Sequence, residues 1–182
     1  MPDLLTLCSS VKAVRNCKEP SQLRHLLAVA CRSVLHAYLA NHRITNSDSF
    51  VVIARGGFFF IPALLDEKLL NPFALLGPAR DSPPQVLVTP LEAIRNRHCH
   101  LLDIVVDSGS TLLRCAKVLK RAGSASVSAA AVFGHIESVK TIEEDGCIKN
   151  VWIYDTTNWR ENGLLIPDAQ YDVGDMFTFG NI

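Results

Sequence analysis

The sequence has no excess of charge of either sign. Its 18 lysines and arginines balance 18 aspartates and glutamates, so the formal net charge is zero at pH 7 with neutral histidines. A general nucleic-acid binder carries a basic surface that neutralises phosphates, and this composition argues against that class while allowing a local anion site. With 182 residues, 48% of them hydrophobic and 20% charged, the chain predicts a single globular domain over residues 1–182.

A long hydrophobic run is also absent. No apolar stretch reaches the roughly 18 residues that a membrane helix needs. The segment 1–17 lacks the basic start and the continuous apolar stretch of a secretory signal. We therefore expect a cytoplasmic protein with no membrane partner and no nucleic-acid partner.

The cysteines show no C-x-x-C pair, which argues against a zinc site or a small disulfide framework. We expect reduced thiols, several of them packed in the core, at Cys8, Cys17, Cys31, Cys99, Cys115 and Cys147. The segment 98–100 holds two histidines that a strand would point the same way, as a metal site requires. Polar residues at the solvated start of a strand explain this segment as well, and we assign no metal ligand.

The pattern that is present alternates helical and extended segments. Residues 22–42 predict a helix with Ser21 as its N-cap and an apolar stripe made by Leu23, Leu26, Leu27, Ala30, Val34 and Tyr38. Strands are predicted at 50–54, 99–106, 126–133 and 151–154, and further helices at 58–70 and 110–123, the latter closed by Gly123. The proline-rich segment 71–90 predicts a loop. This order predicts an α/β domain with a mainly parallel sheet flanked by helices.

Two glycine-bearing loops follow predicted strands, at 55–57 and 107–111. Ligands of such sheets bind beyond the carboxyl ends of the strands, so both loops should face one crevice. The second loop offers backbone N–H groups at a helix start, hydroxyls and a glycine, which favour a phosphate. It lacks both the G-x-x-x-x-G-K-[ST] and the G-x-G-x-x-G spacing, which argues against nucleoside triphosphatases and dinucleotide folds. A ligand-free N-cap made by Ser108 or Ser110 is the alternative.

Two acidic residues accompany the second loop. Asp103 lies inside an aliphatic strand, where a carboxylate costs stability unless it meets water, a hydroxyl or a cation. One or two residues from the strand end, it would reach the crevice and bind ribose hydroxyls or a hydrated Mg²⁺; a buried capping aspartate is the alternative. Asp107, in the loop itself, is either a proton acceptor or a turn-forming residue.

The stretch LLDIVVDSGST, residues 101–111, resembles the 5-phosphoribosyl-1-pyrophosphate (PRPP) binding motif of type I phosphoribosyltransferases. The nearest form is that of the uracil phosphoribosyltransferases, roughly LLDPMLATGGS. Further similar stretches follow in the same order: the N-terminal arm and first helix at 4–39, the pyrophosphate loop at 51–65, the segment 89–103 and the C-terminal hood at 163–180. The resemblance implies the type I phosphoribosyltransferase fold, with a hood from about residues 1–20 and 155–182.

The resemblance also assigns roles to individual residues. It implies that Asp103 contacts the ribose hydroxyls of PRPP and that the 5-phosphate is held by Ser108, Gly109, Ser110 and Thr111. Pyrophosphate would be bound by Arg55, Gly56 and Arg80. The hood would bind the base through Leu165, Tyr171, Asp172 and Val173, with Asp172 also near PRPP and its metal. Mg²⁺ as cofactor and a homodimer are further implications.

The departures from the family pattern concentrate on the base. Tyr171 stands where the uracil enzymes have glycine, Met176 replaces a basic residue, and Thr89 replaces a lysine. Asp107 stands where they have alanine and resembles the purine-type enzymes, in which an aspartate near N7 of the base takes its proton.

We therefore predict transfer of 5-phosphoribose from PRPP to uracil or a related heterocycle, with release of pyrophosphate, as in nucleotide salvage. Asp103 and Asp107 are the predicted catalytic residues. The alternative is a catalytically silent or regulatory relative that binds PRPP or a nucleotide. Ile104 favours that alternative, because most type I enzymes have an acidic residue at this position.

Overall fold

The computed structural model describes residues 4–17, 19–67, 69, 71–77, 85–88 and 93–156. Twelve elements follow one another in this part of the chain: α1 (Leu4–Asn16), α2 (Pro20–Asn41), β1 (Asp48–Ile53), the 3₁₀ helix η1 (Gly56–Phe60), α3 (Ile61–Asp66), β2 (Phe73–Gly77), β3 (Gln85–Val88), β4 (His98–Val106), α4 (Ser110–Arg121), β5 (Ser126–Gly134), α5 (Ile136–Asp145) and β6 (Asn150–Asp155).

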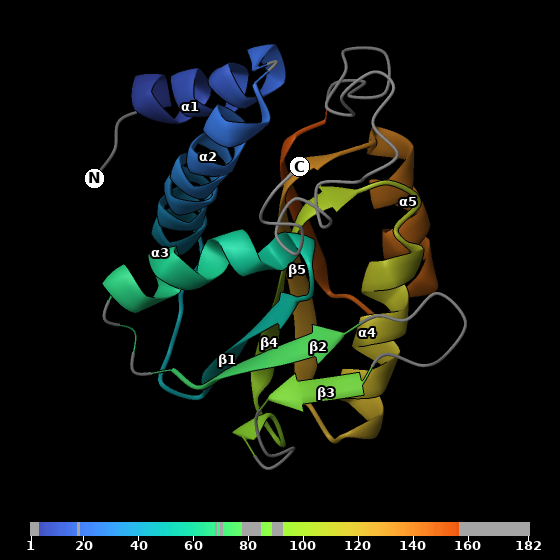
Figure 1. Cartoon of the computed structure of the whole chain (residues 1–182). Coiled ribbons are helices and arrows are strands. Elements are labelled where there is room, and N and C mark those ends of the chain that lie inside the picture. The colour runs from blue at the N-terminus through green and yellow to red at the C-terminus, as the bar shows by residue number, and fades with distance from the viewer. Residues whose placement is uncertain are drawn as a thin grey trace.

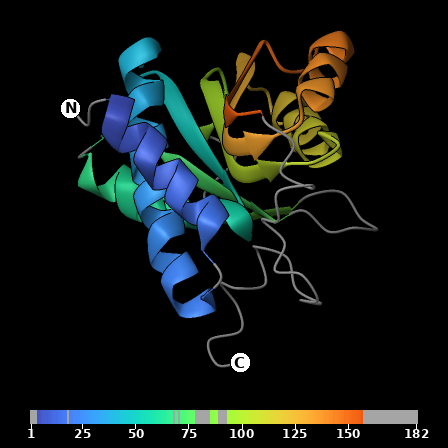
Figure 2. The ribbon, with the colours of Figure 1, turned by 90° about the horizontal axis from the view of Figure 1, so that it is seen from above.

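One six-stranded sheet organises these elements, in the order β3-β2-β1-β4-β5-β6. Every neighbouring pair from β2 to β6 is parallel, and β3 alone runs antiparallel, beside β2. Helices α1, α2 and α3 lie on one side of the sheet and α4 and α5 on the other (Figures 1 and 2). The predicted α/β architecture with a mainly parallel sheet is confirmed.

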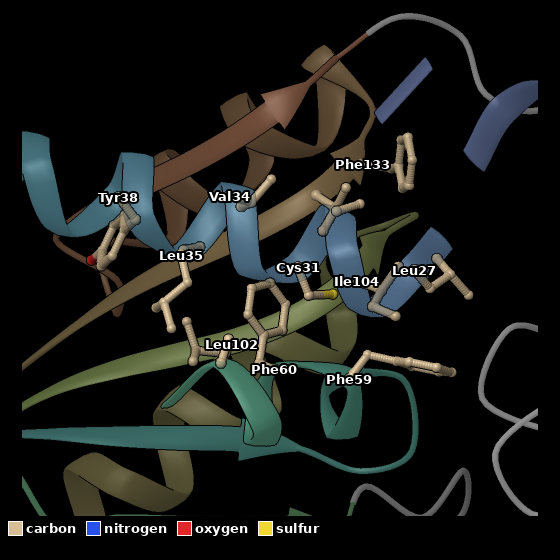
Figure 3. Packing of buried hydrophobic residues seen from close by; sticks show 14 of the residues in the cluster. Leu27, Cys31, Val34, Leu35, Tyr38, Phe59, Phe60, Leu102, Ile104 and Phe133 are labelled. Carbon is tan, nitrogen blue, oxygen red and sulfur yellow. The ribbon is translucent and has the colours of Figure 1, made fainter. Parts of the chain in front are cut away.

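The first hydrophobic core lies between α2 and the sheet (Figure 3). The predicted apolar stripe of α2 is buried at Leu23, Leu27, Ala30, Val34 and Tyr38, with Leu26 half-buried. Packed against it are Phe59, Phe60, Leu102, Ile104 and Phe133. Figure 3 shows Cys31 and Leu35 pointing from α2 toward Ile104, Phe60 and Leu102, so the helix covers the middle of the sheet.

The predicted N-cap of α2 is wrong. The helix begins at Pro20, and Glu19 is the N-cap residue, with φ −97° and ψ 113°. Proline fits the first helical position because its fixed φ is already helical and it has no N–H to satisfy. Ser21 therefore lies inside the first turn.

The predicted loop at 71–90 is wrong in part, because it contains β2 and β3. Strand β2 hydrogen-bonds to β1 from Phe50↔Phe73 to Ile53↔Leu76, and Ala74 and Leu76 are buried. Pro72 directly precedes the strand, and Pro78 directly follows it. Prolines are tolerated at strand ends, where their missing N–H breaks no ladder bond.

The cysteines agree with the expectation of free thiols, since none of the six is in a disulfide. Three are buried, at Cys31, Cys99 and Cys115. Within the described residues, no helix combines the length and the apolar character that crossing a membrane requires.

Candidate functional site

The two predicted loops meet at the carboxyl edge of the sheet. Strands β1 and β4 are parallel neighbours, and the loops follow their last residues, Ile53 and Val106. Gly56, predicted in the first loop and observed as the first residue of η1, lies against Asp103 of β4: a Cβ on this glycine would be 3.0 Å from Asp103 Oδ1. Both loops thus lie at the same edge of the sheet, next to Asp103.

A cavity of about 640 Å³ opens at this edge. It is lined by Asp103, Val105, Val106, Asp107, Ser108, Gly109, Ser110, Thr111, Leu112 and Arg114. All five residues of the predicted phosphate loop are among them. Arg55 is exposed, and neither Arg55 nor Gly56 is one of the ten lining residues.

Arg114 is a lining residue that the sequence analysis did not single out. It follows Ser110 by four positions and Thr111 by three, so it lies on the same face of α4 as both hydroxyls. That spacing was readable from the sequence. Its guanidinium brings positive charge to a cavity that otherwise holds two carboxylates.

The turn 107–111 is shaped by glycine rather than by a serine cap. The N-cap of α4 is Gly109, in the left-handed region with φ 78°, and no side chain caps the helix. The hydroxyl of Ser108 donates to that of Ser110 at 3.0 Å and accepts weakly from the Ser110 N–H at 3.4 Å. The serine N-cap alternative is therefore not what forms. The first amides of α4 and the hydroxyls around them can receive an anion.

Glycine is also required at position 109 because a buried side chain lies too close for a Cβ atom. A Cβ there would be 2.7 Å from Cγ1 of Ile142, which is fully buried on α5. The loop thus rests directly on α5.

Asp103 is half-buried and lies three residues before the end of β4, slightly deeper than predicted. Its Oδ1 accepts the N–H of Ile104 at 2.8 Å. Burial raises the pKa of the Cys31 thiol, and it raises the pKa of Cys115 to about 12; the Asp103 carboxylate adds to both effects. These two thiols remain protonated at neutral pH, so they are not nucleophiles for this site.

Asp107 is tied to the start of α5. Its backbone carbonyl accepts a hydrogen bond from the Ser138 hydroxyl. Its carboxylate is half-exposed, with Oδ1 3.8 Å from His135 Nε2. Neither α5 nor these two residues could be predicted as part of the site from the sequence, because their proximity to the loop depends on the tertiary fold.

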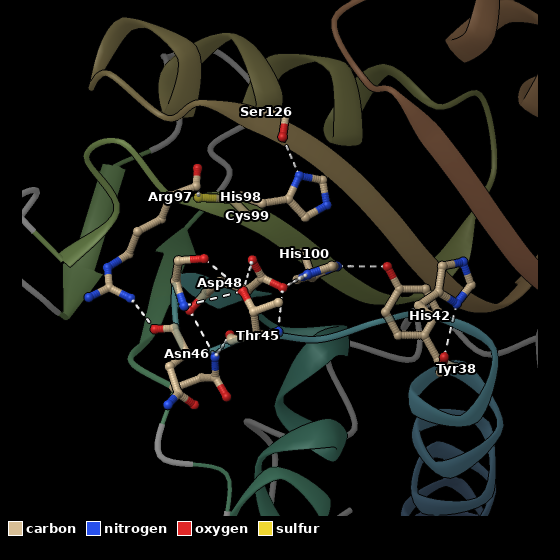
Figure 4. A network of polar contacts seen from close by, with 12 residues as sticks. Tyr38, His42, Thr45, Asn46, Asp48, Arg97, His98, Cys99, His100 and Ser126 are labelled. Atoms are coloured by element: carbon tan, nitrogen blue, oxygen red, sulfur yellow. Dashed lines mark hydrogen bonds and ion pairs between the residues drawn. The ribbon is translucent and has the colours of Figure 1, made fainter.

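The two histidines of segment 98–100 lie together, with ring centroids 4.4 Å apart (Figure 4). They belong to the first residues of β4 and so lie at the edge of the sheet opposite to the cavity. His100 Nδ1 lies 2.8 Å from the Tyr38 hydroxyl, and its Nε2 lies 3.5 Å from Asp48 Oδ2. His98 bonds to the Ser126 hydroxyl. Both imidazole rings are therefore already hydrogen-bonded to other protein groups. Among the described residues no group of three or more His, Cys, Asp or Glu side chains could hold a metal.

The remaining predicted site residues lie outside the described residues. They are Arg80 of the second pyrophosphate position and the hood residues Leu165, Tyr171, Asp172 and Val173. The departures at Thr89 and Met176 fall there too.

Comparison with solved structures places the fold among phosphoribosyltransferases. The AQ2163 protein from Aquifex aeolicus superimposes with a TM-score of 0.71 at 17% identity, over 97% of this chain and 95% of that one. The adenine phosphoribosyltransferase from Giardia lamblia, complexed with 9-deazaadenine, gives a TM-score of 0.58 at 15% identity, over 74% and 83%. The orotate phosphoribosyltransferase from Mycobacterium tuberculosis, in complex with PRPP, gives 0.59 at 10% identity, over 84% and 90%. At these identities the likeness concerns the fold alone.

No curated protein sequence matches the chain. Residues 24–162 match the family described as the phosphoribosyl transferase domain. That span includes both glycine-bearing loops and all ten residues that line the cavity. Because the match covers more than half of the 182 residues, the chain belongs to the phosphoribosyl transferase domain family.

Proposed function

We propose that this protein transfers 5-phosphoribose from PRPP to a ring nitrogen of a base, uracil or a related heterocycle, and releases pyrophosphate, as in nucleotide salvage. Membership of the family and the fold of its structural neighbours support phosphoribosyl transfer as the reaction class. The observation that carries the proposal is the cavity at the carboxyl edge of the sheet. It joins the Asp103 carboxylate and the hydroxyl-rich turn 107–111 in one space of about 640 Å³.

The roles of the residues follow from their chemistry. The 5-phosphate would bind at the start of α4, where backbone N–H groups, the Ser108, Ser110 and Thr111 hydroxyls and the positive end of the helix dipole favour an anion. Asp103 would accept hydrogen bonds from the ribose hydroxyls, which fixes the sugar for attack at C1. Arg55, in the neighbouring loop, would neutralise charge on the departing pyrophosphate.

Asp107 would act on the base. As the base nitrogen bonds to C1 and the C1–O bond to pyrophosphate breaks, the N–H proton of the base has to leave. The half-exposed Asp107 carboxylate lines the same cavity and would accept this proton.

Magnesium fits this site as an ion that would bind together with the substrate phosphates. Mg²⁺ is usually held by one or two carboxylates together with substrate phosphates and water, and Asp103 provides a cavity-lining carboxylate. When bound, the ion would neutralise charge on the pyrophosphate leaving group.

The direct test is incubation of the protein with PRPP, Mg²⁺ and a panel of pyrimidine and purine bases, with pyrophosphate release as the readout. We expect turnover with at least one base. The variant Thr111→Val should weaken PRPP binding, because it removes a hydroxyl from the cavity. The matched control Thr141→Val, on an exposed position of α5, should leave it unchanged. An absence of turnover with every base would remove the claim of catalysis.

A regulatory relative that binds PRPP or a nucleotide is the second candidate. Ile104, the residue that favours it, is fully buried in the core against α2. Calorimetry distinguishes the two functions: tight PRPP binding without turnover supports the regulatory protein, whereas binding and turnover together support the enzyme.

A further inference from the structure

The junction between β5 and α5 supports the Asp107 end of the cavity through several contacts. The His135 N–H donates to the Val106 carbonyl at 3.3 Å, and the Ser138 hydroxyl donates to the Asp107 carbonyl. Ile142, one turn after Ser138 on α5, contacts the turn at Gly109. The backbone on both sides of the Asp107 side chain is therefore fixed by α5.

The carboxylate itself lies nearer to solvent than this backbone. The Asp107 side chain is 50% exposed. The His135 side chain is only 21% exposed, and its Nε2 atom is buried. The distance between Nε2 and Asp107 Oδ1 is 3.8 Å. A largely buried imidazole thus faces a half-exposed carboxylate at a distance that a small rotation closes to a hydrogen bond.

We propose that His135 is a positioning residue for Asp107: its Nε2–H group binds one carboxylate oxygen and leaves the other oriented into the cavity toward the acceptor base. Hydrogen bonds of this kind are often long without substrate and shorten when the site is filled. An imidazole that donates to a carboxylate restricts the orientation of both groups.

The proposal rests on the proposed function, and its proton balance is simple. The proton on the attacking nitrogen passes to the Asp107 oxygen that faces the base, while the N–C1 bond forms and pyrophosphate leaves with the electrons of the C1–O bond. His135 keeps its own proton throughout. It changes the probability that the Asp107 side chain points at the base, so it should affect kcat and leave PRPP binding, which would use the backbone N–H groups and hydroxyls of residues 108–111, nearly unchanged.

The test compares His135→Phe with His135→Gln. Phenylalanine fills the ring volume without a donor, whereas glutamine keeps a terminal N–H donor. We expect His135→Phe to lower kcat about tenfold or more with the KM for PRPP within about twofold of wild type. His135→Gln should recover most of the loss. The control His25→Phe makes the same replacement at an exposed position of α2 and should leave kcat unchanged.

The outcomes separate this proposal from the proposed function. Wild-type protein without turnover on any base would remove the proposed function and this inference with it. If the wild-type protein is active and kcat is unchanged in His135→Phe, the positioning role alone is overturned. The same holds if kcat is as low in His135→Gln as in His135→Phe. If His135→Phe shows no cooperative thermal unfolding, His135→Met supplies a donor-free side chain of similar reach, and the same comparison applies.

Discussion

At the scale of single residues, Asp103 links the fold to the proposed chemistry. It interrupts an aliphatic strand, yet its Oδ1 is satisfied by the Ile104 N–H and its carboxylate lines the cavity. Asparagine has the same shape and keeps an oxygen for that N–H, but it lacks the charge that strengthens hydrogen bonds from ribose hydroxyls.

We therefore expect Asp103→Asn to fold and to lose about 10- to 100-fold in PRPP affinity, equivalent to about 1.5–3 kcal/mol for charge-assisted bonds. Isothermal calorimetry with PRPP and Mg²⁺ measures the loss, and thermal unfolding checks the fold. Unchanged affinity and turnover in this variant would contradict the role given to Asp103.

Gly56 offers a second residue-scale prediction at the same place. A methyl group there would lie 3.0 Å from Asp103 Oδ1, closer than ordinary contact. Because Asp103 is half-buried, its carboxylate can move away, and Gly56→Ala should displace it rather than unfold the protein. We expect weaker PRPP binding with little change in the melting temperature. A large loss of stability with normal affinity would show that Gly56 serves the fold instead.

At the scale of elements, the contact between the phosphate loop and α5 can be tested with two glycines of similar backbone conformation. Gly109 has φ 78° and Gly146 has φ 72°, so alanine costs about 1–2 kcal/mol of left-handed strain at each. Only Gly109 has a neighbour in the way, the buried Ile142, whereas nothing lies within 4 Å of a Cβ on Gly146.

Gly109→Ala should therefore destabilise the protein by about 1–3 kcal/mol more than Gly146→Ala, the cost typical of overpacking a core. It should also reduce PRPP affinity, because the loop has to move off α5. Urea denaturation and calorimetry measure the two effects. Equal stability losses in the two variants would indicate that the loop does not depend on α5.

The elements that could be predicted from the sequence are those whose signals are local. The β4–α4 unit shows an apolar run, a glycine turn and a helical stripe within 24 residues. The predicted bounds of the strand and of the helix agree with the structure to within one or two residues. Strand β2 has only five residues between prolines, and it becomes a strand through hydrogen bonds donated and accepted by β1, a partner about 20 residues away. Such a pairing leaves no local pattern.

The same limit applied to the candidate site. Asp103, Asp107 and the hydroxyls of the turn could be placed at one edge because the carboxyl ends of parallel strands share it. His135 and Ser138 reach Asp107 from a helix about 30 residues later in the chain. Their polar side chains gave no sign of a site in the sequence, since exposed helix starts often have such residues.

At the scale of the whole molecule, the buried histidines at the sheet edge opposite the cavity make the stability of the protein depend on pH. Burial lowers the pKa of His100 to about 4, with His98 and His42 adding to this and Asp48 opposing it. Burial lowers the pKa of His98 as well. Asp48 raises this pKa, whereas Lys149, Lys120 and His42 lower it further. An unfolded histidine titrates near pH 6.5. Between about pH 6.5 and 4 the unfolded chain therefore binds protons that the folded chain does not, and stability falls as the pH falls.

The shift of His100 alone amounts to about 3 kcal/mol over the full window and about 2 kcal/mol between pH 7 and pH 5. We expect urea denaturation, followed by tryptophan fluorescence, to show this loss in wild type. His100→Asn should be less stable at pH 7, because it weakens the contacts to Tyr38 and Asp48, and it should lose clearly less stability between pH 7 and pH 5.

The control His25→Gln, at an exposed position of α2, should keep the wild-type dependence of stability on pH. An equal slope in His100→Asn and wild type would assign the pH dependence to other groups, and the carboxylates are poor candidates because they titrate mainly below this window.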